Sequence, residues 1–129
     1  MVKFREFETS SGKKVVCGKN AEQNEDVVKQ AGKNEILVHT KEAGSSFCNI
    51  KARAGILGSV SKKDIYEAGV FCASYSKDWK HGKKNISVHV FKGKDTYKEK
   101  EMKQGTHGVK KFKTIKINKH DIEEFVKGK

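Results

Sequence analysis

Apolar residues gather in short clusters along the whole chain, and their spacing predicts strands and helices in turn. Alternating or continuous apolar and aromatic positions predict short strands in "KFREFET", "KKVVCGK", "EILVHT", "SFCNI", "NISVHVF" and "KKFKTIKI". The first two segments flank "SSG", where Gly12 is free to adopt a positive φ. A hairpin is therefore expected at the start of the chain.

Two shorter helices are predicted from their capping residues. Asn20 precedes "AEQNEDVVKQ" and can accept a hydrogen bond at the N-cap, with Gln23 at the capping-box position. Asn118 can cap a short terminal helix in "KHDIEEFVKGK" in the same way.

The longest predicted helix begins after Ser61, with Asp64 at its capping-box position. The run "KKDIYEAGVFCASYSKDW" places one set of small and apolar residues on a single helical face: Ile65, Ala68, Gly69, Cys72, Tyr75 and Trp79. Glycine costs a helix about 1 kcal/mol relative to alanine, so Gly69 indicates that a strand or loop crosses close to it. We expect an α+β fold, with six or seven short, mainly antiparallel strands around one long buried helix and two shorter helices.

The length of the chain and the spacing of its cysteines and histidines limit the class of protein to which it can belong. The 129 residues predict a single domain, residues 1–129. Cys17, Cys48 and Cys72 include no CxxC pair and are expected to be buried free thiols. The five histidines have no HxxxH or HExxH spacing, so neither a metal nor a cofactor is expected. The amino terminus lacks the apolar stretch of a signal peptide and no run is long enough to span a bilayer, so a cytoplasmic location is expected.

The dipeptide Gly18-Lys19, just before a predicted helix, raises the possibility of a phosphate-binding loop. A P-loop requires GxxxxGK[ST], whereas here five residues separate Gly12 from Gly18 and Asn20 stands in place of the hydroxyl. The segment is therefore not a P-loop. The helix start could still hold one backbone phosphate of a nucleic acid, although capping explains the same residues equally well.

Positive charge is concentrated in one part of the chain. The net charge is +12, and residues 77–119 contain 14 basic and 4 acidic side chains. Such a field attracts polyanions, first nucleic acid and more weakly an anionic membrane. The alternative is that these lysines only form a solvated surface and bind no partner, because 26 of the 28 basic residues are lysine.

Four blocks of sequence resemble, in one order, the NFACT-R domain, an RNA-binding module of ribosome-associated quality-control factors. The blocks are "FREFETSSGKKVVCGKNAEQNEDVV", "NEILVHTKEAGSSFCNI", "EAGVFCASYSK" and "VHVFKGKDTYKEKEMKQGTHGVKKFKTIKI". Leu37 and Val38 replace the family's Trp-Phe, Ser46 replaces a histidine, and Gln104 replaces a proline.

The resemblance implies a stand-alone domain that binds structured RNA, such as tRNA or ribosomal RNA, in ribosome-associated quality control or translation. Its partners would include the ribosome or a larger quality-control factor, DNA is a possible ligand, and no membrane is expected. Candidate RNA-binding residues near the first helix and the following strands are Lys19, Asn20, Asn24, His39, Lys41 and Ser45. Those in the basic segment are Lys92, Lys98, Lys100, Lys103, Lys110, Lys111 and Lys113.

Two other classes of function are a nuclease and a protein-interaction adaptor. A magnesium-dependent nuclease needs clustered carboxylates, and the acidic candidates beside the basic segment are scattered: Glu35, Asp95, Glu99 and Glu101. No catalytic residue is therefore assigned, and an enzyme is not expected. A basic protein-interaction adaptor or a general nucleic-acid-binding protein remains the alternative, because acidic partners respond to the same field.

Overall fold

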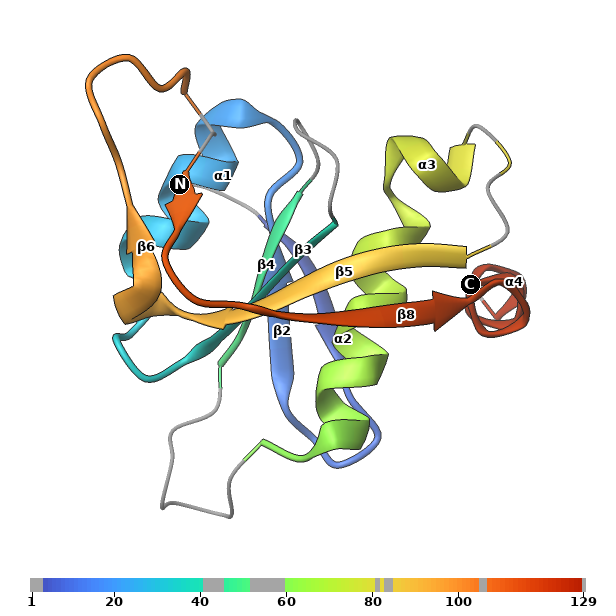
Figure 1. Cartoon of the computed structure of the whole chain (residues 1–129). Helices are drawn as coiled ribbons and strands as arrows, with labels where there is room; N and C mark the ends of the chain where they lie inside the picture. Colours follow the sequence, from blue (N-terminus) through green and yellow to red (C-terminus); the bar gives the residue numbers. More distant parts are fainter. Residues whose placement is uncertain are drawn as a thin grey trace.

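The computed structural model describes residues 4–40, 46–51, 60–80, 82, 85–104 and 107–128 (Figure 1). The amino-terminal half contains β1 (Arg5–Glu8), β2 (Lys14–Cys17), α1 (Ala21–Gln30), β3 (Ile36–Thr40), β4 (Phe47–Ile50), α2 (Lys62–Ser74) and α3 (Lys77–Lys80). The remainder contains β5 (Asn85–Lys92), the 3-10 turn η1 (Gly93–Asp95), β6 (Thr96–Tyr97), β7 (Gly108–Val109), β8 (Lys113–Asn118) and α4 (Lys119–Lys127).

Six strands form one antiparallel sheet in the order β1-β2-β4-β3-β5-β8, and β6 pairs with β7 in a separate two-stranded ribbon. The predicted α+β class is confirmed. The ribbon leaves the sheet between β5 and β8, which are neighbours in space although an excursion of the chain separates them (Figure 1).

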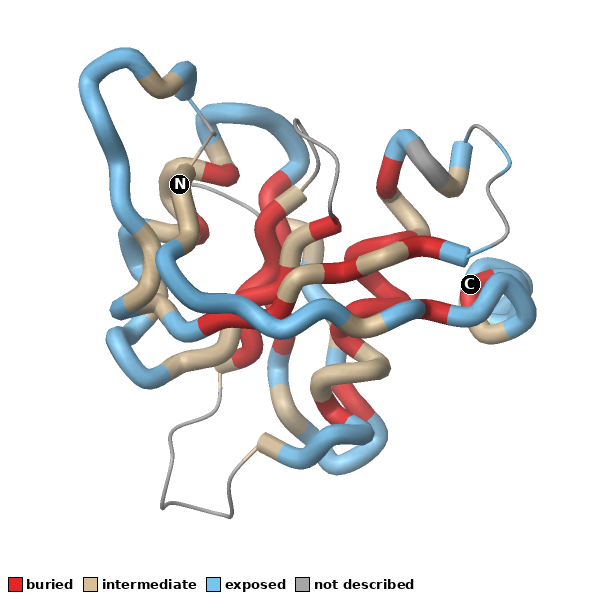
Figure 2. Tube along the Cα trace, in the orientation of Figure 1, coloured by how far each residue is buried: buried red, intermediate tan, exposed pale blue. Residues whose placement is uncertain are grey.

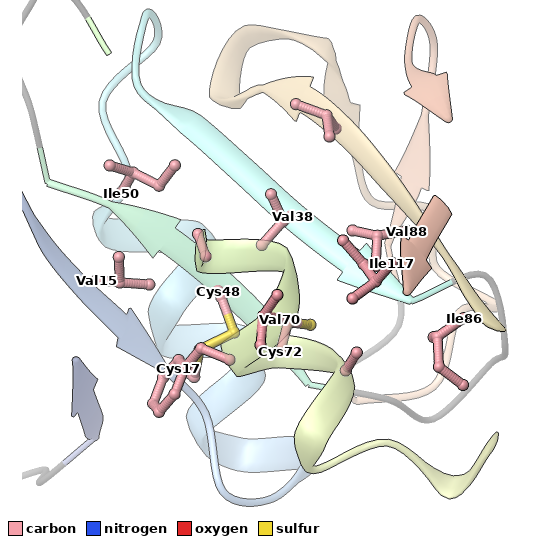
Figure 3. Close-up of a cluster of buried hydrophobic side chains, with 14 of the residues drawn as sticks. Val15, Cys17, Val38, Cys48, Ile50, Val70, Cys72, Ile86, Val88 and Ile117 are labelled. Atoms are coloured by element: carbon pink, nitrogen blue, oxygen red, sulfur yellow. A yellow bond between two sulfur atoms is a disulfide. The ribbon is translucent and has the colours of Figure 1, made fainter. Parts of the chain in front are cut away.

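Helices pack on both faces of the sheet. The larger core lies between the sheet and α2, where Val38, Cys48, Val88 and Ile117 are all buried against the helix (Figures 2 and 3). Because strand side chains alternate between faces, Leu37 points the other way and packs with Val27 of α1 in a second, smaller cluster. The sheet is thus a two-sided layer, with α2 on one face and α1 over part of the other.

The predicted turn and helix starts are confirmed. Gly12 has φ of 90° in the β1–β2 turn. The Asn20 side chain accepts from Gln23 N, and Asn118 accepts from His120 N in α4. Ser61 and Asp64 form a reciprocal capping box at the start of α2. These features depend on residues within one turn of each other, which is why the sequence predicts them.

The prediction of one helix extending to Trp79 is wrong. The α2 helix ends at Ser74, and α3 begins at Lys77. The hydroxyl of Ser76 donates to Ala73 O at 2.7 Å and accepts from Trp79 N at 3.2 Å. One buried serine therefore satisfies backbone groups of both helices, which stabilises a break that helical periodicity does not reveal.

The prediction of three free thiols is also wrong. Cys17 of β2 and Cys48 of β4 are directly opposite residues of neighbouring strands, and their sulfurs form a disulfide (Figure 3). Their separation of 31 residues hides the pairing in the sequence. Cys72 is the buried free cysteine.

No helix among the described residues combines the length and apolarity required to cross a lipid bilayer.

Candidate nucleic-acid interface

A lysine-lined groove lies where β5 ends beside the beginning of β8. In this antiparallel pair Val90 is opposite Lys113, so the residues following β5 face those preceding β8. The groove has a volume of about 470 Å³, and its apolar lining comes from Ile36, Ile65, Val90 and Phe91. Its polar lining is Lys92, Lys94, Asp95, Lys111 and Lys113, and Phe112 completes it. We call this the lysine groove.

Backbone hydrogen bonds fix both walls of the lysine groove. Gly93 N and Lys94 N donate to Glu35 O and Lys33 O, at 3.1 and 3.0 Å. A Cβ at Gly93 would lie 2.3 Å from Gly32 O, so this close approach requires glycine. Lys110 N donates to Asp95 O at 2.8 Å and joins the two walls. The lysine side chains thus extend from a rigid frame.

The charge of the lysine groove suits a polyanion. Its lining includes four lysines and one carboxylate, that of Asp95, and the four lysines are all exposed. Ammonium groups on long exposed side chains can each approach a phosphate oxygen without a fixed geometry. The site is therefore suited to a phosphate backbone, and less to recognition of particular bases.

Two stacked ring pairs occupy the sheet face opposite α2. His39 stacks on Phe47 with centroids 4.2 Å apart, and His89 stacks on Phe112, also at 4.2 Å. His39 and His89 are opposite residues of β3 and β5, so the two pairs lie on adjacent strands. Phe112 is 50% exposed and belongs to the lysine groove. The groove thus has an aromatic surface beside its lysines.

The start of α1 is joined to His39 through Phe47. Gly18 N donates to Phe47 O at 3.2 Å, and Phe47 N donates to Asn24 Oδ1, also at 3.2 Å. A Cβ at Gly18 would lie 2.3 Å from Asn24 Oδ1, so glycine is required. Phe47 therefore lies between the start of α1 and His39. This geometry also gives Gly18 and Asn24 a structural explanation that needs no RNA.

The acidic residues considered for a nuclease do not assemble a metal site. Glu35 Oε1 accepts from Gly32 N at 2.7 Å and from Lys51 Nζ at 2.9 Å, so this carboxylate closes a loop. Asp95 is in the lysine groove, whereas Glu99 and Glu101 lie in the segment after β6. In the described part of the chain, no three His, Cys, Asp or Glu side chains are grouped to hold a metal ion.

A known family of protein domains matches most of the chain. The family described as NFACT protein RNA binding domain matches residues 3–111. The chain belongs to this family. Its resemblance to the NFACT-R domain is thus confirmed over nearly its whole length, including five of the six strands of the main sheet, β1 to β5, and one wall of the lysine groove.

A solved structure has the same fold as this NFACT-R domain. It is the C-terminal part of the fibronectin/fibrinogen-binding protein from Streptococcus suis, with a TM-score of 0.80 and 22% sequence identity. The similarity covers 96% of this chain and 49% of that one, so the NFACT-R domain spans about half of its relative. No curated protein matches the chain.

The other predicted RNA-binding residues of the NFACT-R domain are spread over several places. Lys92, Lys111 and Lys113 meet in the lysine groove, and Lys110 adjoins it. Lys19 is exposed at the start of α1, where the Asn20 side chain is used in capping. Lys41 and Ser45 lie outside the described residues.

The three remaining predicted lysines, Lys98, Lys100 and Lys103, lie in the loop after β6, and Lys98 joins this loop to α1. Lys98 Nζ bonds to Glu25 Oε1 at 2.5 Å and to Lys103 O at 2.6 Å. His107 Nε2 lies 3.3 Å from the other Glu25 oxygen, and burial lowers the pKa of this histidine despite that carboxylate. Lys100 and Lys103 are exposed. Glu25 therefore anchors the loop to the helix.

Sequence reasoning missed Lys94, His89 and Phe112 as site residues. The alternation of "NISVHVF" does place His89 on the face opposite the valines, and Phe112 interrupts a run of lysines. Those signals were present. The sequence does not reveal that β5 pairs with β8, and this pairing brings His89 and Phe112 together.

Proposed function

We propose that this NFACT-R domain binds folded RNA, such as tRNA or ribosomal RNA, with the phosphate backbone in the lysine groove. The observation that carries the proposal is the convergence of Lys92, Lys94, Lys111 and Lys113 on one groove. Membership of an RNA-binding family supports RNA as the polyanion. DNA carries the same phosphates and is expected to compete more weakly.

The chemistry of lysine determines how such binding should behave. Each ammonium that neutralises a phosphate releases condensed counterions, so affinity falls steeply with salt. If six or so phosphates are neutralised, the affinity should decrease by about three orders of magnitude between roughly 50 and 200 mM salt. Sequence preference should be weak, because point charges on flexible stems do not read base edges.

We place this binding in ribosome-associated quality control or translation, in the cytoplasm, with the ribosome or a larger quality-control factor as partner. The resemblance of the sequence to quality-control factors, together with the match to an RNA-binding domain family, supports this role. The domain is proposed to act as a binding module without catalysis, because its candidate carboxylates are engaged or scattered.

A charge-matched pair of variants tests the proposal. The groove variant replaces Lys92, Lys94, Lys111 and Lys113 with glutamine. The control replaces Lys77, Lys80, Lys119 and Lys127, which are exposed residues of α3 and α4 at the opposite end of β5 and β8. Both variants lose the same charge, so a general effect of net charge is the same in both.

Binding of a tRNA transcript is measured by fluorescence anisotropy over a range of salt concentrations. For the groove variant we expect the slope of log affinity against log salt to become shallower by about three, and for the control by much less. Equal losses in the two variants would show diffuse attraction and overturn the proposed site.

A protein-interaction adaptor is the second candidate, because the same lysines attract acidic proteins. Heparin and polyglutamate are used as competitors against the bound tRNA. Displacement by polyglutamate at the same charge concentration as RNA would favour the adaptor, whereas selective retention of folded RNA favours the proposed function.

A further inference from the structure

Phe112 is an exposed ring held in place from one side. Its neighbour is the imidazole of His89, with ring centroids 4.2 Å apart and an interplanar angle of 27°. The phenylalanine nevertheless stays 50% exposed. One face of the ring is therefore covered by His89, and Phe112 also lines the lysine groove.

His89 is itself a well-fixed support. It lies near the middle of β5, with His39 of β3 opposite on one side and Thr114 of β8 opposite on the other. The imidazole is half-buried between these two strands. A ring that stacks on such a support has little rotamer freedom left to lose when a ligand covers its other face.

An exposed aromatic ring flanked by lysines matches the chemistry of an unpaired nucleotide. The ring can stack on the base, and the lysines can bind the phosphates. Lys111 and Lys113 flank Phe112 in the sequence and line the same groove. Single-stranded nucleic acid is bound by this combination, with the backbone held by cations while a base stacks on an aromatic side chain.

We propose that Phe112 stacks an unpaired base of the RNA bound in the lysine groove, with His89 as a positioning residue. This proposal rests on the proposed function and adds the class of ligand: RNA with an unpaired segment, such as a loop or single strand. A base inside a duplex is already stacked on its neighbours, so a fully paired helix does not offer this face. Every base has such a face, so no base preference is expected.

The experiment compares three variants at Phe112 and elsewhere. Phe112→Leu removes the aromatic face and keeps apolar volume, and Phe112→Trp keeps an aromatic face. Tyr97→Leu is the control, because Tyr97 is 39% exposed, packs over Gly108, and does not line the groove. Thermal unfolding of each variant verifies that the domain remains folded.

The probes are a short single-stranded RNA that carries a fluorescent adenine analogue and a paired duplex containing that strand. Stacking quenches the analogue. We expect Phe112→Leu to weaken single-strand binding about tenfold and to abolish quenching. Phe112→Trp should retain both, Tyr97→Leu should retain both, and duplex binding should change less than twofold in every variant.

The positioning role of His89 has its own readout. We expect His89→Ala to reduce the quenching at saturation, because the phenylalanine ring loses its support, while the salt slope stays unchanged. Unaltered single-strand affinity and quenching in Phe112→Leu would overturn the stacking proposal. Loss of binding by the lysine variants in the same assay would still support the groove, so the two proposals fail separately.

Discussion

Gly69 of α2 and Ile117 of β8 are in contact at the centre of the core: a Cβ added to Gly69 would lie 2.8 Å from Ile117 Cδ1. Ile117 is fully buried, so its side chain has little room to move away. The sequence-based prediction that another segment crosses close to Gly69 is confirmed, and that segment is β8. The glycine sets how closely the helix approaches the sheet.

We expect Gly69→Ala to lower the free energy of unfolding by up to about 2 kcal/mol. Alanine gains about 1 kcal/mol in helix propensity, but inserting a methyl group into a close-packed core costs typically 1 to 3 kcal/mol through displaced side chains. Urea denaturation of the two proteins measures the difference.

A second substitution isolates the steric cause. Ile117→Val removes the clashing Cδ1 and alone costs roughly 1 kcal/mol. In the double variant the two losses should not add, because the space vacated by Cδ1 accepts the new methyl group. Additive losses would mean that Gly69 is needed for some other reason.

The cap of α1 can be separated from phosphate binding at the same place. Asn20→Ala should lower stability by about 1 kcal/mol, because Gln23 N loses the acceptor that it has at 2.9 Å. Lys19 is exposed, so Lys19→Ala should leave stability unchanged. Chemical denaturation of both variants measures this contrast.

RNA binding by Lys19 is a distinct prediction. We expect Lys19→Ala to weaken binding of a folded tRNA by about 1 kcal/mol, as for loss of one charged hydrogen bond. The same loss is predicted for Lys41→Ala, at a position outside the described residues. Unstructured RNA serves as the control ligand. Normal tRNA affinity in both variants would mean that "GKNAEQN" forms the start of a helix and does not bind RNA.

Asp64 connects the β1–β2 turn to α2. Its carboxylate accepts from Ser11 Oγ at 2.5 Å and from Ser61 N at 3.0 Å. Burial alone would raise the pKa of Asp64, but the hydrogen bonds from Ser11, Ser61 and Thr9 outweigh it and lower the pKa from 3.8 to about 2. The folded domain therefore favours the charged form.

The lowered pKa predicts a specific loss of stability in acid. The unfolded chain takes up the proton first, so the contribution of Asp64 is complete above about pH 4 and is lost as the pH falls towards 2. It amounts to about 2 kcal/mol. Asp64→Asn should be less stable than the parent by that amount at neutral pH, and the difference should shrink between about pH 4 and 2. Urea titrations across this range measure it.

The cysteines predict three different results in thiol assays. Cys72 is buried, and burial raises its pKa to about 12. No thiol of the native protein should therefore react with an alkylating reagent. Unfolding without reductant should expose one thiol, and unfolding with reductant should expose three. Mass spectrometry counts the added groups. Three thiols without reductant would mean that Cys17 and Cys48 are not joined.

The disulfide also bears on where the protein works. A bond that closes a segment of this length stabilises a fold by roughly 3 to 4 kcal/mol in the chain-entropy account. Cytosolic compartments keep most cysteines reduced. Repeating the denaturation with reductant measures the stability that a cytoplasmic domain would retain.

Local features of the fold were predictable from the sequence, whereas long-range pairing was not. Capping by Asn20, Ser61 and Asn118 depends on neighbours within a turn, and each was predicted. The order of strands was not readable, because every strand has similar composition and any antiparallel partner would satisfy its pattern. The Cys17–Cys48 disulfide follows from that order alone.

The site was predictable in its chemistry but not in its shape. Lysine density identified the basic segment that contains Lys92, Lys111 and Lys113. Which lysines converge depends on β5 pairing with β8 across an excursion of the chain, so Lys98 was grouped with them although Glu25 holds it near α1. The stacking of Phe112 on His89, from which its proposed role is argued, likewise depends on that pairing.

Because β8 is an edge strand of the sheet, its lysines also influence whether copies of the chain associate. An outermost strand offers its backbone as a template for another copy of the chain, and charged side chains along it discourage such pairing. Lys113 and Lys116 are exposed on this strand. Neutralising them would therefore promote self-association, and at Lys113 it would also weaken the proposed RNA binding.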